Sequence, residues 1–239
     1  MHFDKRGNNP ILAVGFLFKG LKLLARPELR KFIIIPMLIN VVLYSVALSL
    51  GYFYISDLID QFIPGWLQWL SWVLWPLFFI SFFIGGFFTF TVVANLLAAP
   101  FYGKLSAKTL AMVSDQAFAT AEQPLPKVLL AETKRIGYLG SRALPLLILS
   151  IIPGLNVIAP FLWALFGAWG MALEYLAYPL ENQGVLFSEQ KALVKSVRLG
   201  ALSFGGLAVL GLTVPVLNII VAPAAVIGAT LYFHEIKRD

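Results

Sequence analysis

Long uncharged stretches separated by short charged segments give this sequence its pattern. Residues 32–55 and residues 61–103 contain no Asp, Glu, Lys or Arg. Both runs exceed the roughly 20 apolar residues that an α-helix needs to cross a bilayer. They predict a first membrane span over 32–55 and a second long helix over 66–103. Tryptophans recur every third residue at the start of the second helix, as is typical of an interfacial aromatic belt: Trp66, Trp69, Trp72 and Trp75.

The charged segments predict the orientation of these two spans. Residues 1–31 and residues 104–142 are both net basic, whereas the connection between the two spans carries Asp57 and Asp60. Because basic segments stay in the cytoplasm, residues 1–31 are expected to form a basic cytoplasmic N-terminal segment and residues 104–142 a polar cytoplasmic helical segment. The acidic turn then faces the opposite side, which gives two full crossings. Prolines at the Glu122–Pro126 stretch are expected to break any helix there.

Two further apolar stretches, 143–173 and 199–233, are too long for one crossing and short for two. Each is interrupted by the same pattern, P-x-L-N-x-I-(x)-A-P, at Pro153–Pro160 and at Pro215–Pro223. Two prolines around a Leu-Asn turn stop a helix and restart it, leaving arms of about 10 to 16 residues. Such arms predict two re-entrant hairpins that enter and leave on the cytoplasmic side. The alternative is that each stretch forms one long kinked span.

Composition agrees with an all-α integral membrane protein, folded as a single membrane domain over residues 1–239. The chain is 59% hydrophobic and 13% charged, with a mean hydropathy of +0.84, whereas soluble domains hold about 45–50% apolar and about 25% charged residues. A net charge of +6 fits cytoplasmic loops and lipid headgroups in so apolar a chain, so we expect membrane lipid and not nucleic acid as a partner.

The residue inventory limits the chemistry. The chain has no cysteine, and its two histidines are His2 and His234, near the two ends. Disulfides, thiol catalysis and histidine-held metals are therefore excluded. No pairing of a nucleophile with a base is present either. We accordingly expect no catalytic residue, no metal, no cofactor and no enzymatic activity.

Several polar residues interrupt the apolar stretches. Four asparagines lie near prolines: Asn40, Asn95, Asn156 and Asn218. They could line a pathway where helices are broken, or each amide could bond a carbonyl that the neighbouring proline frees. Glu174 follows an uncharged run and precedes Tyr175, Tyr178 and Pro179. Its carboxylate is either solvated or paired with Lys or Arg, or else takes part in a proton pathway. Arg135 and Arg142 lie near the start of the first hairpin and are interpreted as anchors to lipid headgroups. They would attract anions only if they converged on an anion pathway.

The start of the first span is the strongest candidate for an anion site. The sequence Arg26-Pro27-Glu28-Leu29-Arg30-Lys31-Phe32 places proline in the first turn of a helix, where free amides carry the positive end of the helix dipole. Arg30 and Lys31 stand beside those amides, an arrangement that suits a tetrahedral oxyanion. A basic segment that only fixes the membrane topology would have the same composition, so both interpretations, anion site and topology anchor, stay open.

Short motifs spread along most of the chain resemble those of one known family. They are Arg26–Phe32 with Pro36 and Asn40, Trp66–Trp72, Leu74–Leu77, Ala94–Asn95, Ala98–Phe101, Ile152–Gly154, Tyr178–Asn182 and Ile227–Thr230. With them the sequence resembles the CysZ-type sulfate permeases of bacteria over residues 15–238. The resemblance implies sulfate uptake across the inner membrane for cysteine biosynthesis, by a channel-like or proton-dependent route. It also implies two long membrane helices, two partly penetrating hairpins, and a homo-oligomer that is a dimer or larger.

The family's sulfate-binding motif is Gly-Leu-Arg followed by a basic residue. The resemblance places it on Glu28, Leu29, Arg30 and Lys31, with Glu28 at the position of the glycine. Two other functions remain open from the residues: a permease for another oxyanion such as sulfite, thiosulfate or molybdate, and a non-transporting membrane scaffold or assembly protein.

Overall fold

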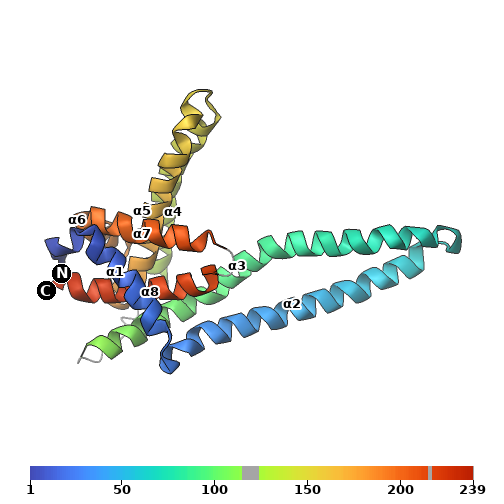
Figure 1. Ribbon diagram of the computed structural model, residues 1–239, viewed down its shortest axis with the longest axis horizontal. Coiled ribbons are helices and arrows are strands. Elements are labelled where there is room, and N and C mark those ends of the chain that lie inside the picture. Colours follow the sequence, from blue (N-terminus) through green and yellow to red (C-terminus); the bar gives the residue numbers. More distant parts are fainter. Residues whose placement is uncertain (115–123, 215–216, 239) are drawn as a thin grey trace. The chain divides into compact units, whose positions relative to one another are not determined.

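The computed structural model describes residues 1–114, 124–214 and 217–238, without the side chains of residues 40, 58, 60, 62, 87, 88, 90–100, 125 and 128. Within this part of the chain the fold is helical, as expected, apart from one pair of two-residue strands (Figure 1). The elements are β1 (His2–Phe3), η1 (Lys5–Asn8), α1 (Pro10–Leu24), α2 (Pro27–Phe62), η2 (Gly65–Leu70), α3 (Ser71–Val113), α4 (Leu125–Ile151), η3 (Leu155–Val157), α5 (Ala159–Asn182), α6 (Phe187–Ser196), α7 (Arg198–Leu212), α8 (Leu217–Ile236) and β2 (Lys237–Arg238).

Residues 33–101 form one compact unit, a pair of long helices made of most of α2 and of the first part of α3. The Tyr44 hydroxyl donates to the Gly86 carbonyl, and the rings of Tyr52 and Trp75 stack with centroids 4.9 Å apart. These contacts pair the two helices in antiparallel fashion. η2 turns the chain between them and carries Trp66 and Trp69, so the aromatic belt begins on a 3₁₀ turn and continues into α3.

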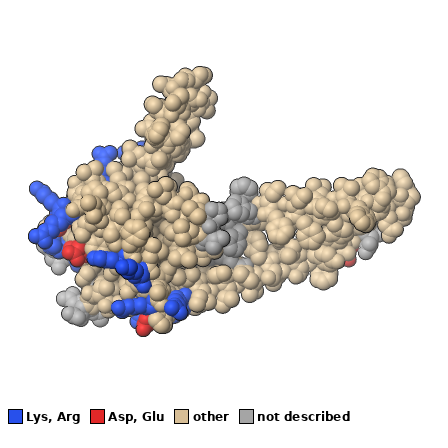
Figure 2. Space-filling model, in the orientation of Figure 1, with Lys and Arg blue, Asp and Glu red and all other residues tan. Residues whose placement is uncertain are grey.

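Both helices of this pair are long and apolar enough to cross a membrane, over Pro27–Asp57 and Gly65–Gly86. Almost none of their most apolar stretches is buried within the protein, 6% for α2 and 0% for α3. No Lys or Arg occurs in residues 33–101, and the space-filling view shows no blue side chain along this helix pair (Figure 2). Apart from Asp57 and Asp60 near the turn, the sequence of this unit is uncharged. An exposed surface of this apolar kind suits contact with lipid.

Residues 1–32 and 102–239 form the second compact unit. Its core lies where α1, α5, α7 and α8 pack together, and α8 supplies twelve of the buried residues. The rings of Phe204 and Tyr232 stack with centroids 6.1 Å apart, and Phe16 lies against Tyr232 at 5.7 Å. A helix that is apolar on all sides is expected to be buried in this way.

Close approach of α1 to α8 depends on two glycines. A Cβ placed on Gly20 would lie 2.2 Å from the Ala224 carbonyl oxygen, and one on Gly228 would lie 2.7 Å from the Phe16 carbonyl oxygen. No side chain fits at either distance, so the two backbones touch directly. Small residues permit the same contact between helices inside membranes.

The first hairpin turns where its repeated motif predicts. α4 ends at Ile151, the turn passes through η3, and α5 begins at Ala159 with Pro160 in its first turn. Gly154 has φ of 85°, a left-handed conformation that favours glycine. The Trp163 Nε1–H donates to Ser150 Oγ over 3.0 Å, which joins the two arms near the turn. Both helices continue well beyond the apolar stretch, so residues 104–142 are divided between the end of α3 and most of α4.

The second repeat differs from its prediction. α7 ends at Leu212, and α8 begins at Leu217 and runs unbroken through Pro223. The expectation that both prolines of the motif stop a helix is therefore wrong for Pro223. A proline removes a single hydrogen bond, and Pro223 lies in a buried part of α8 whose packing holds the helix together. α8 is also longer than the predicted arms, and it is a third helix long and apolar enough to cross a membrane. Of its most apolar stretch, 67% is buried within the protein. Pro215 lies outside the described residues.

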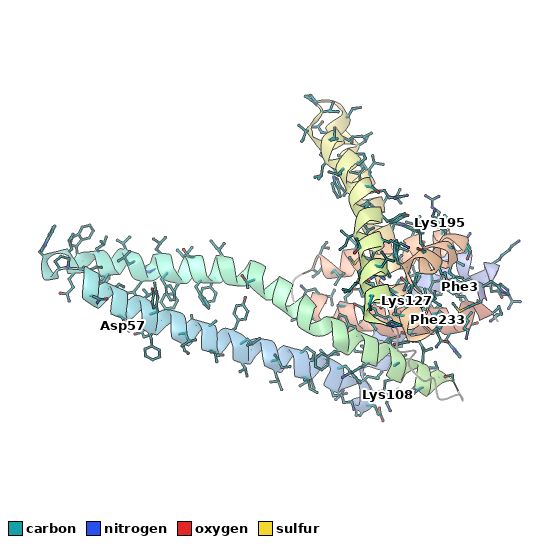
Figure 3. All side chains as sticks on the ribbon, turned by 180° about the vertical axis from the view of Figure 1, so that it is seen from behind. Phe3, Asp57, Lys108, Lys127, Lys195 and Phe233 are labelled. Carbon is teal, nitrogen blue, oxygen red and sulfur yellow. The ribbon has the colours of Figure 1, made fainter. Side chains whose placement is uncertain are left out.

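The two ends of the described chain meet. β1 pairs antiparallel with β2, with His2 opposite Arg238 and Phe3 opposite Lys237. The Phe3 ring packs edge-on against Phe233, with centroids 6.1 Å apart, and the two are seen together in Figure 3. Arg238 also forms an ion pair with Asp4, whose pKa is lowered first by the backbone N–H of Arg6 and then by the Arg238 charge.

Candidate functional site

The candidate anion site, predicted over Arg26–Phe32, lies at the corner between α1 and α2. α1 ends at Leu24 and α2 begins at Pro27, so two residues make the turn. The Ala25 and Arg26 amides donate to carbonyls of the last turn of α1, while the Arg26 carbonyl accepts from the first turn of α2. Proline at the first helical position fixes the start of α2, because its missing N–H costs nothing there.

The Arg30 guanidinium spans this corner. Its Nε donates to the Ala25 carbonyl oxygen at 2.9 Å, which caps the end of α1. Among the described residues no carboxylate lies within ion-pair distance of Arg30, and neither of its Nη atoms has a described hydrogen bond. The side chain is therefore oriented by one nitrogen and keeps two nitrogens for a ligand. Arginine nitrogens in this fork geometry suit the paired oxygens of an oxyanion.

The backbone amides of this corner are less available than expected. The Leu29 and Arg30 amides both donate to the Arg26 carbonyl, at 3.1 and 3.3 Å. Proline has no amide hydrogen, so the Glu28 amide is the one donor of the first turn without a described partner. The expectation of several free amides is thus reduced to one, and it lies at the position where the family motif has glycine.

The four residues of the motif do not face the same way. Leu29 is fully buried, whereas Glu28, Arg30 and Lys31 are exposed. The Lys31 ammonium lies 5.4 Å from the centre of the Phe32 ring, close enough for a cation–π contact. Leu29 thus fixes the corner in the core while its charged neighbours point outward. The carboxylate of Glu28 is exposed along with the two cations.

Neither Asn156 nor Asn218 joins this corner. Asn156 lies on η3 at the tip of the α4–α5 hairpin, and Asn218 lies in the first turn of α8, both exposed. The described hydrogen bonds connect neither of them with Glu28–Lys31. Asn40 and Asn95 lie on α2 and α3, but their side chains are outside the described part of the chain.

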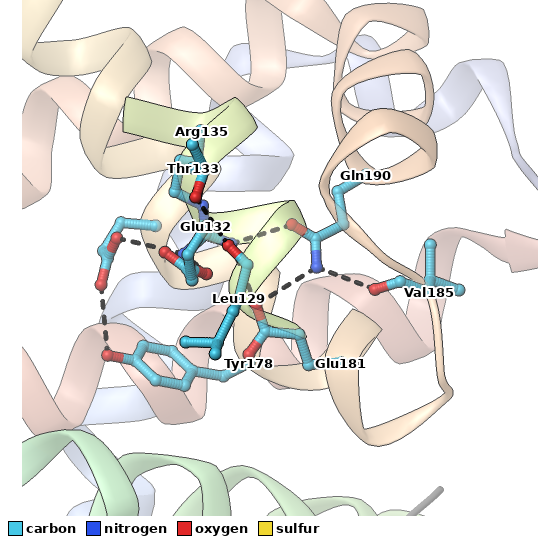
Figure 4. A network of polar contacts seen from close by, with 9 residues as sticks. Leu129, Glu132, Thr133, Arg135, Tyr178, Glu181, Val185 and Gln190 are labelled. Carbon is cyan, nitrogen blue, oxygen red and sulfur yellow. Dashed lines mark hydrogen bonds and ion pairs between the residues drawn. The ribbon is translucent and has the colours of Figure 1, made fainter. Parts of the chain in front are cut away.

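Glu174 belongs to a second polar cluster, which surrounds Arg135 (Figure 4). The Arg135 side chain is 12% exposed and forms ion pairs with three carboxylates: Glu132 at 3.1 Å, Glu181 at 2.9 Å and Glu174 at 3.9 Å. Each carboxylate is just over 40% exposed. The pairing alternative for Glu174 is therefore the one that the structure shows. Arg135 joins α4 to α5 and is not a free headgroup anchor.

Gln190 extends the cluster to α6. Its Oε1 accepts a hydrogen bond from Arg135 Nη2 at 3.0 Å, and its Nε2 donates to the Val185 carbonyl at 2.8 Å and to Glu181 at 3.3 Å. Because Gln190 is 1% exposed, all of its polar groups must be satisfied by the protein. The cluster therefore ties three helices together at the base of the first hairpin. Within the described residues no group of His, Asp or Glu is placed to hold a metal ion.

Burial, together with the neighbouring charges, shifts the pKa of two side chains of this cluster, Glu132 and Tyr178. Burial raises the pKa of Glu132 above 4.5, Arg135 opposes that rise, and the neighbouring Glu181 and Glu174 add to it. Burial also raises the pKa of Tyr178, whose hydroxyl donates to Glu174 at 3.3 Å. Three carboxylates share one guanidinium, so the cluster carries two excess negative charges when all are ionised.

The sequence held weak signals for this cluster. Glu132 and Arg135 stand three residues apart, and Glu174 and Glu181 stand seven apart, so each pair shares a helix face. Tyr178 and Glu181 also belong to one of the family motifs. The pattern does not show that the two faces meet, because Arg135 and Glu181 are 46 residues apart in the chain.

Comparison with known proteins gives a consistent result. Residues 16–223 match the family described as "Sulfate transporter CysZ/Etoposide-induced protein 2.4". The "Sulfate transporter CysZ" of Pseudomonas syringae pv. tomato is 42% identical over 227 residues, covering 91% of this chain and 90% of that protein.

Two further relatives have the same name. The protein of Pseudomonas aeruginosa is 39% identical over 227 residues, with 91% of this chain and 92% of the relative covered. That of Pectobacterium atrosepticum is 36% identical over 235 residues, with 95% and 86% covered. The family match spans most of the sequence and includes the α1–α2 corner, the first hairpin and the Arg135 cluster. The chain therefore belongs to the sulfate transporter CysZ family.

Proposed function

We propose that this chain takes up sulfate across the bacterial inner membrane and so supplies sulfur for cysteine biosynthesis. The observation that carries the proposal is the 42% identity, over 91% of the chain, to a protein named sulfate transporter CysZ. The exposed cationic corner between α1 and α2 supports it, since a dianion needs positive charge and oriented donors where it is first bound. The chain is a multi-pass membrane protein with three helices suited to crossing by length and composition, or up to four if the bent α6–α7 pair is one span.

Sulfate is proposed to bind at the α1–α2 corner. The two Nη atoms of Arg30, the Lys31 ammonium and the Glu28 amide are the donors available to it. Leu29 holds the backbone in place from the core. The Glu28 carboxylate must turn away from a bound anion, which its exposed position allows.

The membrane arrangement proposed is two full spans, α2 and α3, with two hairpins that penetrate partway. The tip of the first hairpin carries no charge and exposes its apolar side chains, with Ile151, Val157 and Phe161 between 70% and 81% exposed. A tip that emerged into water on the far side would have little reason to be so apolar. The charged residues that flank the two apolar stretches lie toward the bases of the hairpins, among them Arg135, Glu174, Arg198 and Glu235.

Partial insertion in the membrane has more support for the α4–α5 hairpin than for the α7–α8 hairpin. α4 and α5 fall outside the helices that qualify as candidate spans, whereas α8 qualifies. α8 is included as a partial span because most of its surface is covered by protein, with α1 and α7 against it. The asparagines at the two tips, Asn156 and Asn218, together with Asn40, Asn95 and Glu174, are proposed as residues along the anion's path. A homo-oligomer, dimer or larger, is proposed as the working form.

Flux of radiolabelled sulfate into proteoliposomes tests the proposed function. We expect uptake above that of empty vesicles, and a large loss of uptake for Arg30→Ala but not for Lys127→Ala, which removes an exposed cation from α4. Uptake equal to that of empty vesicles would contradict transport and favour a membrane scaffold. Competition by unlabelled sulfite, thiosulfate or molybdate, stronger than by sulfate itself, would assign the protein to another oxyanion.

A further inference from the structure

Helix α1 has two faces of opposite character. Its buried face, formed by Ala13, Phe16, Leu17, Gly20 and Leu24, packs into the core. The residues opposite are exposed and define what we call the α1 outer face: Ile11, Phe18, Lys19, Lys22 and, just after the helix, Arg26. Ile11 is 83% exposed and Phe18 52% exposed. The face is thus apolar at its start and cationic at its end.

The charge around this face has a single sign. Residues 5–27 contain no Asp or Glu, and their charged residues are Lys5, Arg6, Lys19, Lys22 and Arg26. Among the described residues none of Lys19, Lys22 and Arg26 takes part in an ion pair. The Lys19 ammonium lies 4.3 Å from the centre of the Phe16 ring, which restrains its position without neutralising its charge. The cations on the outer face therefore have no counter-charge within ion-pair distance in the described part of the chain.

The position of these cations along the chain places them at a membrane surface. α2 begins at Pro27 and is a candidate span from that residue onward. At about 1.5 Å per residue, the six residues from Arg26 to Phe32 cover roughly 9 Å of helix. Arg26 thus lies within about the depth of the headgroup region from the point where the chain enters hydrocarbon. Lys22 and Lys19 precede it in the chain and lie on α1. Ile11 and Phe18 suit shallow insertion between acyl chains beside them.

We propose that the α1 outer face is a docking surface for anionic phospholipid, in which Lys19, Lys22 and Arg26 hold headgroup phosphates and Ile11 and Phe18 contact acyl chains. Charge complementarity selects this occupant, because zwitterionic lipid offers no net charge to three unpaired cations. Each basic residue near an anionic membrane surface raises affinity by roughly fivefold. The inference is independent of sulfate transport and does not use Arg30 or Lys31.

The test titrates the purified full-length protein, in an uncharged detergent, with dioctanoyl phosphatidylglycerol by calorimetry. Dioctanoyl phosphatidylcholine and inorganic phosphate are titrated in parallel. We expect phosphatidylglycerol to bind far more tightly than either. The K19Q/K22Q/R26Q variant should lose roughly a hundredfold of phosphatidylglycerol affinity, and Phe18→Ser should weaken binding of both lipids.

The matched control is K127Q/K134Q/K195Q, which removes three exposed cations from α4 and α6; Lys127 and Lys195 are labelled in Figure 3. Its lipid affinity should fall by less than about threefold, since the three removed charges belong to α4 and α6 and not to the α1 outer face. Equal losses in the two triple variants would overturn the docking surface, as would equal affinity for the two lipids. Phosphate binding as tight as that of phosphatidylglycerol would reveal a simple anion site and would also overturn the proposal. Unchanged melting temperatures for both variants show that each is folded.

Discussion

Arg135 on α4 and Glu181 on α5 face each other with Nη2 and Oε1 2.9 Å apart. The contact links residues 46 positions apart in the chain, and the same guanidinium also reaches Glu132, Glu174 and Gln190. The base of the first hairpin is therefore held by one buried cation shared among three helices. The Arg135 Nε has no hydrogen-bond partner among the described residues. The ion pairs, the Gln190 hydrogen bond and the Phe187 ring, whose centre lies 5.6 Å from the guanidinium, compensate for the burial of this charge.

Replacing Arg135 with glutamine should destabilise the fold by about 2–3 kcal/mol. The change leaves three carboxylates facing one another without a cation, which is costly in a partly buried cluster, although their exposure moderates the loss. Denaturant unfolding followed by tryptophan fluorescence measures the effect. Lys134→Gln removes the neighbouring exposed charge and should cost less than about 0.5 kcal/mol. Equal stability of the two variants would contradict the role assigned to Arg135.

Glu132 should make the free energy of unfolding fall as the pH rises through the pKa of its carboxyl group. Burial raises its pKa above 4.5, the value expected for the unfolded chain, so the folded state binds its proton more tightly. Protonation therefore stabilises the fold, and this contribution is lost as the pH rises from 4.5 through the raised pKa. Glu132→Gln should flatten the decline of stability over that interval, measured as the unfolding midpoint against pH. Glu189→Gln, which removes an exposed carboxylate from α6, should keep the slope of the unmodified protein.

The sequence predicted those elements that are specified by residues close together in the chain. The length of the uncharged runs located α2 and α3, and Pro27 marked the first turn of α2. The Pro153–Pro160 motif located the first turn in the same way. The Arg135 cluster depends on how α4, α5 and α6 pack, and no spacing within one helix encodes that. Its residues appeared in the sequence as separate charges near a membrane edge.

The two copies of the repeated motif show why a local pattern can mislead. Pro160 starts a helix, whereas Pro223 lies inside one. The first motif is exposed at a hairpin tip, where nothing opposes a break, but the second leads into the core against α1, where burial of the helix on both sides outweighs one lost hydrogen bond. The same residues therefore give different backbones in different surroundings.

Two glycines on α1 should respond oppositely to alanine. At Gly20 a new methyl group would meet the α8 backbone at 2.2 Å and push the helices apart, so Gly20→Ala should destabilise by about 1–3 kcal/mol. At Gly15 nothing lies within 4 Å, so Gly15→Ala should stabilise by about 0.5–1 kcal/mol through helix propensity. Thermal unfolding of the two variants measures the difference. A loss of stability in both would show that the substitutions act on the helix and not on its contact with α8.

Removing the Arg30 side chain should weaken sulfate binding by about 1.5–3 kcal/mol, the usual value of hydrogen bonds to a charged group. Its two Nη atoms are among the donors at the corner without a described protein partner, while its Nε donates to the Ala25 carbonyl oxygen. Calorimetric titration of Arg30→Ala with sulfate measures the loss. Unchanged affinity would eliminate this corner as the binding site.

Glu28→Gln provides the opposite change at the same corner. Removing an exposed like charge beside the anion should raise sulfate affinity by roughly twofold to fivefold, the range of exposed charge interactions. Because this variant gains affinity, misfolding cannot imitate the result. A loss of affinity in Glu28→Gln would show that the carboxylate supports the site through contacts absent from the described corner.

The depth of the two hairpins is open to chemical labelling, because the chain has no cysteine of its own. Asn156→Cys and Asn218→Cys place single thiols at the two tips, and Asp57→Cys places one near the far end of α2. If the tips stop inside the bilayer, a membrane-impermeant maleimide added outside intact cells should label position 57 readily and leave positions 156 and 218 largely unmodified. Labelling of position 218 alone would make α8 a full span, in agreement with its length of 20 residues. Labelling of position 156 would overturn the partial insertion of the α4–α5 hairpin, because its uncharged tip would then have to lie in water.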